Sequence, residues 1–252
     1  MTLRVMEGGA DAVKAMGLAD YIWLDGEGGI HVKKKAIYMV AEAGGLDVVP
    51  ILDPWVATVY LGDGKHDRLF LNPCHYIPDP LRGEGNFIVL CEAKTIKDDA
   101  HPTNTRAMLR SYIEDRKDPH GTWWGVRQSY RFAAKPRGEH FIAGERHLCA
   151  CMDAGLLLHS GQVDAPNGKW NFKLGPRSFP DVLDPGHATA AVMGDFLIFG
   201  RYLLEKIARE NGFSLELLGC SVYCSTEQMR MPIEPEAAKT VADIVQARLR
   251  FP

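Results

Sequence analysis

The cysteines are the first side chains in this sequence that suggest chemistry, because they occur in two closely spaced pairs. Cys149 and Cys151 are separated by one residue, with His147 nearby, and Cys220 and Cys224 are separated by three. Zinc sites usually use Cys-x-x-Cys spacing, which neither pair has. The first pair also falls in a helical pattern, where residues two apart point in different directions. The sequence therefore favours reduced thiols that are buried as small hydrophobic side chains.

Serines and histidines form no visible catalytic set. Ser129 and Ser221 have no recognisable base partner, so no nucleophile is predicted. Four histidines fall in segments expected to be loops, where functional residues are frequent, and any one could act as a general base near neutral pH. The sequence singles out none of these four: His75, His101, His120 and His187.

The segment 169–174 alternates polar and apolar residues, which predicts a strand with one polar face. Lys169, Asn171 and Lys173 then share that face, with Arg177 just beyond. Cationic side chains could therefore line a binding surface there. The alternative is an ordinary strand face in contact with solvent.

Composition limits the kinds of partner. The chain has 252 residues, 46% of them hydrophobic and 24% charged, with a formal net charge of −3. These values are typical of a globular protein with one large domain or two small ones. They give no electrostatic reason to expect nucleic acid or an anionic membrane as a partner. The apolar runs are too short to cross a bilayer, and residues 1–19 lack a secretory signal pattern, so a cytoplasmic location is expected.

Periodicity and turn residues predict helices and strands in mixed order, which is typical of an α+β fold. A domain boundary is expected near residue 100. Helices are expected at 9–16, 103–115, 143–159, 188–210 and 237–249. Strands are expected at 21–24, 30–38, 68–71, 87–93, 123–134, 169–174 and 214–224, with loops filling most of 53–80.

Several segments, taken in order, resemble the type II glutamine synthetases. They are Tyr21–Gly26, Asp79–Arg82, Asn86–Glu92, Thr103–Arg106, Trp170–Pro176, Gly194–Asp195 and Gly219–Arg230. The resemblance implies a small N-terminal β-grasp-like part at 1–100. It also implies a C-terminally truncated glutamine-synthetase-like part at 101–252, with a curved antiparallel sheet backed by helices. It further implies a homo-oligomer, since neighbouring subunits of the family share each site.

The same resemblance implies a metal site whose ligands are largely lost. The family holds two divalent cations among carboxylates, which neutralise ATP while glutamate is phosphorylated and ammonia attacks. Four glutamates and a histidine of that set correspond here to Arg127, Ser129, Asp164, Asn171 and Ser221. Their summed charge changes from about −4 to 0 at neutral pH. A guanidinium at position 127 repels a cation instead of binding it. The chain also stops at Pro252, before the family's C-terminal stretch.

Because all five replacements are polar or charged, we expect a repurposed pocket that binds an amino acid or another small anion without metal or cofactor. Arg127 would hold a carboxylate and Asp164 an ammonium group. Two alternatives stay open. One is a non-catalytic scaffold or regulatory partner, and the other is an ATP-dependent amide ligase. The predicted site consists of Arg127 and Asp164 as catalytic residues and Ser129, Asn171, Lys173 and Ser221 as substrate-binding residues.

Overall fold

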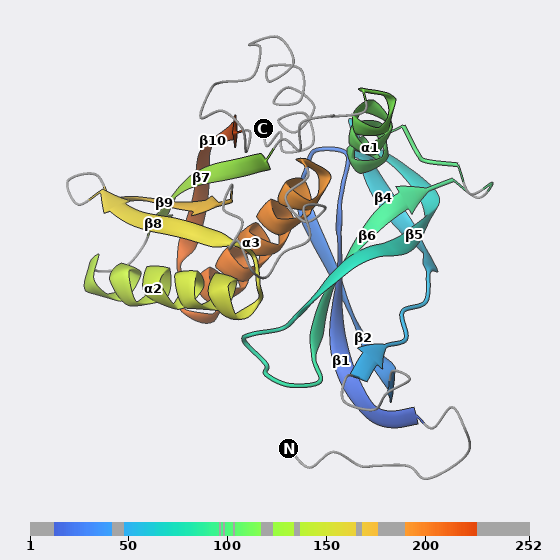
Figure 1. The fold of residues 1–252 in the computed structure, drawn as a ribbon, viewed down its shortest axis with the longest axis horizontal. Helices are drawn as coiled ribbons and strands as arrows, with labels where there is room; N and C mark the ends of the chain where they lie inside the picture. The colour runs from blue at the N-terminus through green and yellow to red at the C-terminus, as the bar shows by residue number, and fades with distance from the viewer. Residues whose placement is uncertain are drawn as a thin grey trace. The chain divides into compact units, whose positions relative to one another are not determined.

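The computed structural model describes residues 13–41, 48–95, 97, 99–102, 104–116, 123–133, 137–164, 168–175 and 190–225. The chain divides into two compact units, residues 1–104 with 251–252, and residues 105–250. Each unit is built around its own sheet (Figure 1). The mixed α+β class is confirmed, with a curved antiparallel sheet backed by helices in the second unit.

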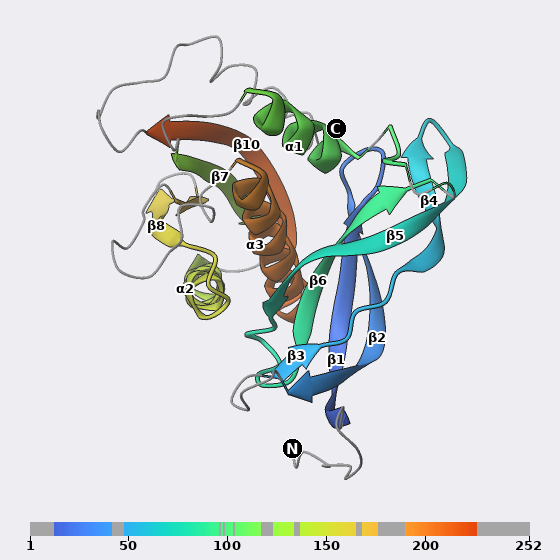
Figure 2. The same ribbon diagram turned by 45° about the vertical axis from the view of Figure 1, so that its right-hand side comes forward.

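The first unit is a six-stranded sheet in the order β3-β2-β1-β6-β5-β4. Only the β1–β6 pair is parallel among these strands. Figure 2 shows the pronounced bend of β5. The strands are β1 (Val13–Leu24), β2 (Ile30–Ala41), β3 (Val48–Pro50), β4 (Trp55–Gly62), β5 (Lys65–Pro78) and β6 (Phe87–Lys94).

Two predictions for this unit were wrong. The helix expected at 9–16 is strand from Val13 onward, because β1 continues in register with β2 and pairing overrides helix propensity. Residues 9–12 lie outside the described part. The segment 53–80, expected to be mostly loop, forms the β4–β5 hairpin. Its turn is Asp63-Gly64, with φ of 51° and 72°, the positive values that a two-residue hairpin turn requires.

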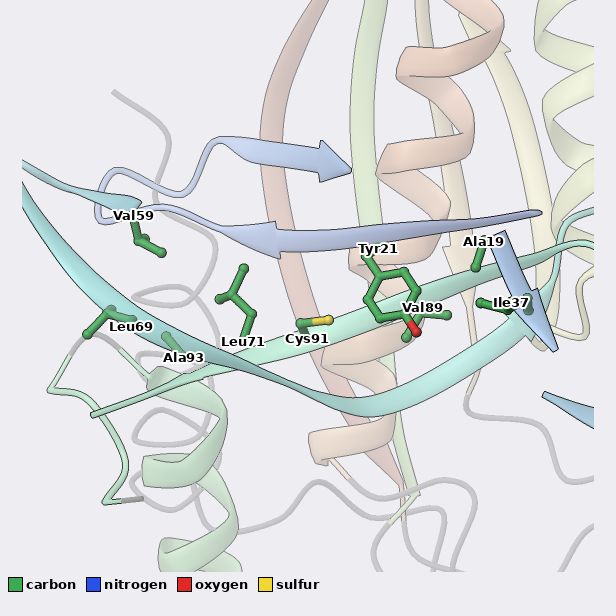
Figure 3. Packing of buried hydrophobic residues seen from close by; sticks show 9 residues of the cluster. All are labelled: Ala19, Tyr21, Ile37, Val59, Leu69, Leu71, Val89, Cys91 and Ala93. Atoms are coloured by element: carbon green, nitrogen blue, oxygen red, sulfur yellow. The ribbon is translucent and has the colours of Figure 1, made fainter. Parts of the chain in front are cut away.

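One face of this sheet holds the core of the first unit (Figure 3). Trp55 on edge strand β4 lies 5.5 Å from Tyr21 and 5.6 Å from Trp23, measured between ring centroids. Both partners are on β1, which is three strands away in the sheet order, so the sheet must curl over this face. The buried residues are Ala19, Tyr21, Ile37, Val59, Leu69, Leu71, Val89, Cys91 and Ala93.

The opposite side of β1 carries a buried carboxylate. Asp20 is fully buried and accepts hydrogen bonds from Arg82 Nη2 at 2.7 and 2.9 Å and from Lys34 Nζ at 3.1 Å. Arg82 Nη1 lies 3.0 Å from Asp79 Oδ2. The motif Asp79–Arg82 therefore has a structural role, since it supplies the cation that compensates Asp20.

The second unit contains a four-stranded antiparallel sheet in the order β10-β7-β9-β8, with three helices. The predicted helices near 103–115 and 188–210 and the predicted strands near 123–134, 169–174 and 214–224 are confirmed, with ends shifted by one or two residues. The elements are α1 (Thr105–Arg116), β7 (Trp123–Ala133), α2 (Arg137–Asp153), β8 (Leu158–Asp164), β9 (Lys169–Leu174), α3 (Ala190–Glu210) and β10 (Ser214–Ser225). Within the described residues, no helix is long and apolar enough to cross a membrane.

The helix predicted at 143–159 extended too far toward its C-terminus. It begins earlier, at Arg137, and ends at Asp153, and strand β8 begins at Leu158 after a four-residue turn. Gly155 takes a φ of 72°, and the Leu156 amide donates back to the Cys151 carbonyl at 3.0 Å, which is a helix-terminating arrangement. The helix predicted at 237–249 lies outside the described residues.

Helices α2 and α3 pack on one face of this sheet. Along β7 the even-numbered residues from Val126 to Phe132 are buried, and Trp170, Phe172 and Leu174 of β9 share their face. His147 of α2 lies 4.8 Å from Phe172 between ring centroids. Gly144 of α2 sits so close to Trp170 that a Cβ there would come within 2.3 Å of its ring. This close packing fixes which face of the strands the helices cover.

His147 is fully buried in this layer. Its Nε2 lies 2.9 Å from the Gly200 carbonyl of α3, so Nε2 must carry the proton to donate there. Burial lowers the pKa of His147 from its ordinary value to about 4. The folded state therefore keeps the ring neutral under conditions in which the unfolded chain binds a proton.

This predicts that acid weakens the second unit. Between pH 6.5 and pH 4 the unfolded state binds more protons, so stability falls as pH falls, by about 2 kcal/mol at pH 5 at about 1.4 kcal/mol per pKa unit. Urea denaturation at pH 7 and pH 5 would measure this loss. The variant His147→Gln should lose less stability between pH 7 and pH 5 than the wild type. The variant His66→Gln, at an exposed histidine, should lose as much as the wild type. Equal losses in wild type and His147→Gln would contradict the assignment.

Candidate functional site

The face of the second sheet opposite α2 and α3 carries most of the predicted site residues, and we call it the polar face. Residues directly paired in antiparallel strands point to the same side, so the register orders this face into rows. The first row is Ser221–Arg127–Lys173–Ser160, the middle row is Ser129–Asn171–Gln162, and the third row is Glu216–Arg131–Lys169–Asp164.

The first row places two cations side by side. Arg127 on β7 is the direct partner of Lys173 on β9. Like charges in opposite positions of neighbouring strands destabilise a sheet. No described acidic side chain forms an ion pair with either residue, and Nε of Arg127 is buried without a hydrogen-bond partner. The row therefore has an uncompensated positive charge and an unused donor.

The middle row is neutral and nearly inaccessible. Ser129 is 8% exposed and Asn171 is 5% exposed. Among the described residues, neither side chain makes a hydrogen bond. Their polar atoms are not among the described buried atoms that lack a partner, so the small exposed fraction leaves these groups within reach of solvent.

The third row has mixed charge. Arg131 Nη1 donates to Glu216 Oε2 at 3.2 Å, while Arg131 Nε is buried without a partner among the described residues. Lys169 pairs in register with Arg131 on one side and Asp164 on the other. Glu216, Arg131 and Lys169 therefore carry one negative and two positive formal charges along the row.

The structure brings five of the six predicted site residues together and separates one. Arg127, Lys173 and Ser221 lie in the first row, and Ser129 and Asn171 in the next. Asp164 lies two strands and four residues from Arg127, a diagonal of about 16 Å at about 3.3 Å per residue and 4.8 Å per strand. The pairing of a ligand's carboxylate with Arg127 and its ammonium with Asp164 therefore stays a prediction, which needs both side chains to lean toward each other along this diagonal.

A buried network that the sequence did not reveal positions the first row. Arg201 of α3, 3% exposed, donates from Nε to Gln128 Oε1 at 2.8 Å, and its Nη2 also contacts this oxygen. Gln128 Nε2 donates in turn to the carbonyl of Leu218 at 2.9 Å. Leu218 lies in the bulge of β10 that precedes Ser221. The one available signal was an arginine within the apolar sequence of α3.

Burial lowers the pKa of Arg201 to about 10, so its guanidinium stays charged at neutral pH. The network holds α3, β7 and the bulge of β10 together. The bulge adds one extra residue to β10, because Leu218 and Gly219 together stand opposite Ser129, and it therefore sets Ser221 instead of Cys220 opposite Arg127. The geometry of the first row therefore depends on a residue on the other side of the sheet.

The histidines and cysteines that the sequence singled out are distributed over several elements. His75 lies in strand β5 and His101 in the segment before α1, whereas His120 and His187 lie outside the described residues. Burial is confirmed for Cys91 and Cys151, but Cys149 is exposed on α2. Burial also raises the pKa of the Cys151 thiol well above its ordinary value, which makes it unreactive. In the part of the chain that the structure describes, no three His, Cys, Asp or Glu side chains are grouped to hold a metal ion.

Comparison with known proteins finds glutamine synthetases. The chain is 27% identical to the chloroplastic enzyme of Chlamydomonas reinhardtii over 79% of this chain and 59% of that protein. It is 29% identical to a glutamine synthetase of Streptomyces viridochromogenes over 76% of this chain and 60% of that protein. For the Agaricus bisporus protein the values are 26%, 90% and 70%. No family model matches the chain.

A solved structure gives the same result for the fold. A crystal structure described as a novel glutamine synthase homolog matches with a TM-score of 0.53 and 12% identity, over 86% of this chain and 56% of that chain. The chain thus spans about 60% of the length of the first two curated relatives.

The charge of the first row predicts no tight binding of divalent cations. Isothermal titration of the full chain with Mg²⁺ or Mn²⁺ should give no micromolar site, because Arg127 repels a cation at the old ligand position. The double variant Arg127→Glu, Ser129→Glu should gain affinity. Micromolar binding by the wild type that disappears in Asp164→Ala would contradict the prediction.

Proposed function

Because the chain is glutamine-synthetase-like in sequence and in fold, we propose that its polar face binds a small-molecule anion through Arg127 and Lys173, without a divalent cation. The observation that carries this proposal is the first row itself. It contains paired cations without an acidic partner among the described residues, and a buried guanidinium Nε with nothing to donate to. A bound anion would balance the charge of the two cations and would accept a hydrogen bond from Nε of Arg127.

The donor set suits a carboxylate or a phosphate. A guanidinium binds such a group through two parallel N–H bonds, and Nε is one of the donors in the side-on geometry. Lys173 adds a point charge from the neighbouring strand. Ser221 and Ser160 flank the two cations in register and add hydroxyl groups. The site therefore supplies charge and orientation from its own side chains, whereas in the glutamine synthetase reaction that the resemblance implies, metal ions supply the charge.

Loss of the metal- and ATP-dependent ligase reaction is part of this proposal. It is supported by the four positions at which a family ligand is replaced by a side chain that is neither acidic nor histidine, all of which lie in the first two rows, while Asp164 keeps an acid. An ATP-dependent amide ligase remains the alternative that the names of the relatives suggest. It requires divalent cations, so the titration above separates it from metal-free binding.

A scaffold or regulatory partner is the other candidate, and one observation favours it. Helix α2 exposes three large apolar side chains, Phe141 at 49%, Ile142 at 67% and Met152 at 65%. Apolar side chains gathered on one helix are typical of protein–protein contacts. Binding of a small anion would favour the first candidate, and a chain that binds none would favour the scaffold.

Arg127→Ala should weaken anion binding about ten- to a hundredfold, because a charge-assisted hydrogen bond contributes about 1.5–3 kcal/mol. A thermal-shift screen of dicarboxylates, amino acids, inorganic phosphate and nucleotides would find a ligand, and titration calorimetry would measure its affinity. Arg127→Lys should lie between wild type and Arg127→Ala, since it keeps the charge but loses the paired donors.

Arg146→Ala is the matched control for that experiment. Arg146 is a half-exposed arginine of α2 that pairs with Glu210 at 3.0 Å, away from the polar face. Its loss should leave the affinity unchanged. Equal affinity in wild type and Arg127→Ala would refute the proposed site.

We further propose that the chain self-associates, as the resemblance implies and as closed symmetric assembly makes common. Sedimentation velocity at micromolar concentration should show a species larger than the 28.0 kDa chain. A strict monomer at that concentration would count against the assembly and against a site shared between subunits.

A further inference from the structure

We infer that the ligand of the polar face is elongated and carries an anionic group at each end, one bound by Arg127 and the other by Arg131. This inference rests on the proposed anion site and extends it to a class of ligand. It starts from a second guanidinium on the same strand that has the same unused donor as the first.

Arg131 repeats the feature that carries the first site. Its Nε, like Nε of Arg127, is buried and has no hydrogen-bond partner among the described residues. The two arginines are four residues apart on β7, so their side chains leave the same face of the sheet. Each pairs in register with a lysine of β9, Arg127 with Lys173 and Arg131 with Lys169. The polar face therefore presents two arginine–lysine pairs along the same two strands.

The acid beside Arg131 leaves one edge of the guanidinium open to an anion. Glu216 Oε2 lies 3.2 Å from Nη1 of Arg131. A carboxylate or phosphate binds a guanidinium side-on through Nε and Nη2, and Nη1 is not part of that edge. The side chains of Arg131 and Glu216 are 42% and 57% exposed, and an ion pair this exposed contributes little stability. A second anion can therefore bind Arg131 while Glu216 stays in place.

The residues between the two arginines are small and uncharged. Ser129 of β7 and its register partner Asn171 of β9 occupy this middle row, at 8% and 5% exposure. The row offers no charge to hold an anionic group. Two cationic ends separated by a neutral stretch favour a ligand with two separate anionic groups over a continuous polyanion.

The register sets the distance between the two groups. Arg127 and Arg131 are separated by about 13 Å between their Cα atoms, at about 3.3 Å per residue. Side chains stand roughly perpendicular to a sheet, so the guanidinium groups are separated by a similar distance. If the anions lie between the arginines, a hydrogen bond of about 2.9 Å at each end brings them as close as about 7 Å. The two anionic groups of the ligand are therefore about 7–13 Å apart.

The test is a titration series on the full chain with dicarboxylates of constant charge and increasing length, namely succinate, adipate, suberate and sebacate. Their carboxyl carbons are about 4, 6, 8 and 11 Å apart when extended, at about 1.2 Å per bond. Octanoate and decanoate, titrated in parallel, measure what the hydrocarbon chain alone contributes. Suberate or sebacate should bind about tenfold more tightly than succinate and than the monocarboxylate of equal length, because one further charge-assisted hydrogen bond forms.

Variants assign the two ends of the ligand. Arg131→Ala should remove the gain of the long dicarboxylates and leave succinate unchanged, whereas Arg127→Ala should weaken the whole series. Glu216→Gln should tighten only the long dicarboxylates, by about twofold, because it removes a like charge beside the second anion. Arg146→Ala is again the control without effect. Melting temperatures without ligand verify that each variant is folded, and Arg131→Lys, which lacks the side-on edge, replaces Arg131→Ala if that variant unfolds.

The outcomes separate this inference from the proposal beneath it. If all dicarboxylates bind with equal affinity and Arg127→Ala weakens them all, the anion site stands and the two-ended ligand is wrong. The two-ended ligand is also wrong if monocarboxylates gain as much with length as dicarboxylates do, or if two suberate molecules bind each chain. If neither a dicarboxylate nor inorganic phosphate binds the wild type, both the inference and the anion site are refuted.

Discussion

The contact between Arg201 and Gln128 is the interaction on which the second unit depends. A guanidinium that is 3% exposed must have its donors satisfied, because a buried charge without partners costs several kcal/mol. Gln128 provides an acceptor with its oxygen and uses its amide nitrogen to donate to Leu218. One amide therefore connects a helix, the central strand and the bulge of the neighbouring strand. Loss of this amide would remove the hydrogen bond that holds the bulge of β10, and the bulge sets Ser221 opposite Arg127.

The apolar packing around this contact explains why the helices cover one face only. Gly144 and Gly200 let α2 and α3 approach Trp170 and Phe172, with no room for a larger side chain at position 144. His147 completes the layer with its bond to the Gly200 carbonyl. The first unit has an analogous arrangement, in which a buried Asp20 is compensated by Arg82 next to a purely apolar core. Each unit thus combines a dense apolar layer with a buried carboxylate paired to an arginine, Asp20 with Arg82 in the first and Asp195 with Arg106 in the second.

The sequence predicted best where a local pattern and the fold agree. Alternation in 169–174 placed Lys169, Asn171 and Lys173 on one face, and the register confirms that they share it. Strand β4 and most of the long strand β5, outside the strand expected at 68–71, were missed because Gly, Asp, Pro and His suggest loops, whereas Asp63-Gly64 is a hairpin turn and Pro73 lies beside a bulge. The first residues of β1, from Val13 to Met16, were predicted to be helical because their strand structure comes from pairing with β2 and not from their own sequence pattern. The separation of Arg127 from Asp164 could not be predicted, since it depends on how three strands align.

The alternation of side chains along β7 has a consequence for how such a protein evolves. Residues that pack the sheet against its helices and residues that face the polar side occupy alternate positions in the chain and point to opposite faces. Substitutions at 127 or 173, which are partly exposed, can therefore change the charge of the surface without altering the side chains that pack under the helices. Such a division lets the ligand chemistry of the surface change through a few codons while the packing beneath it stays the same.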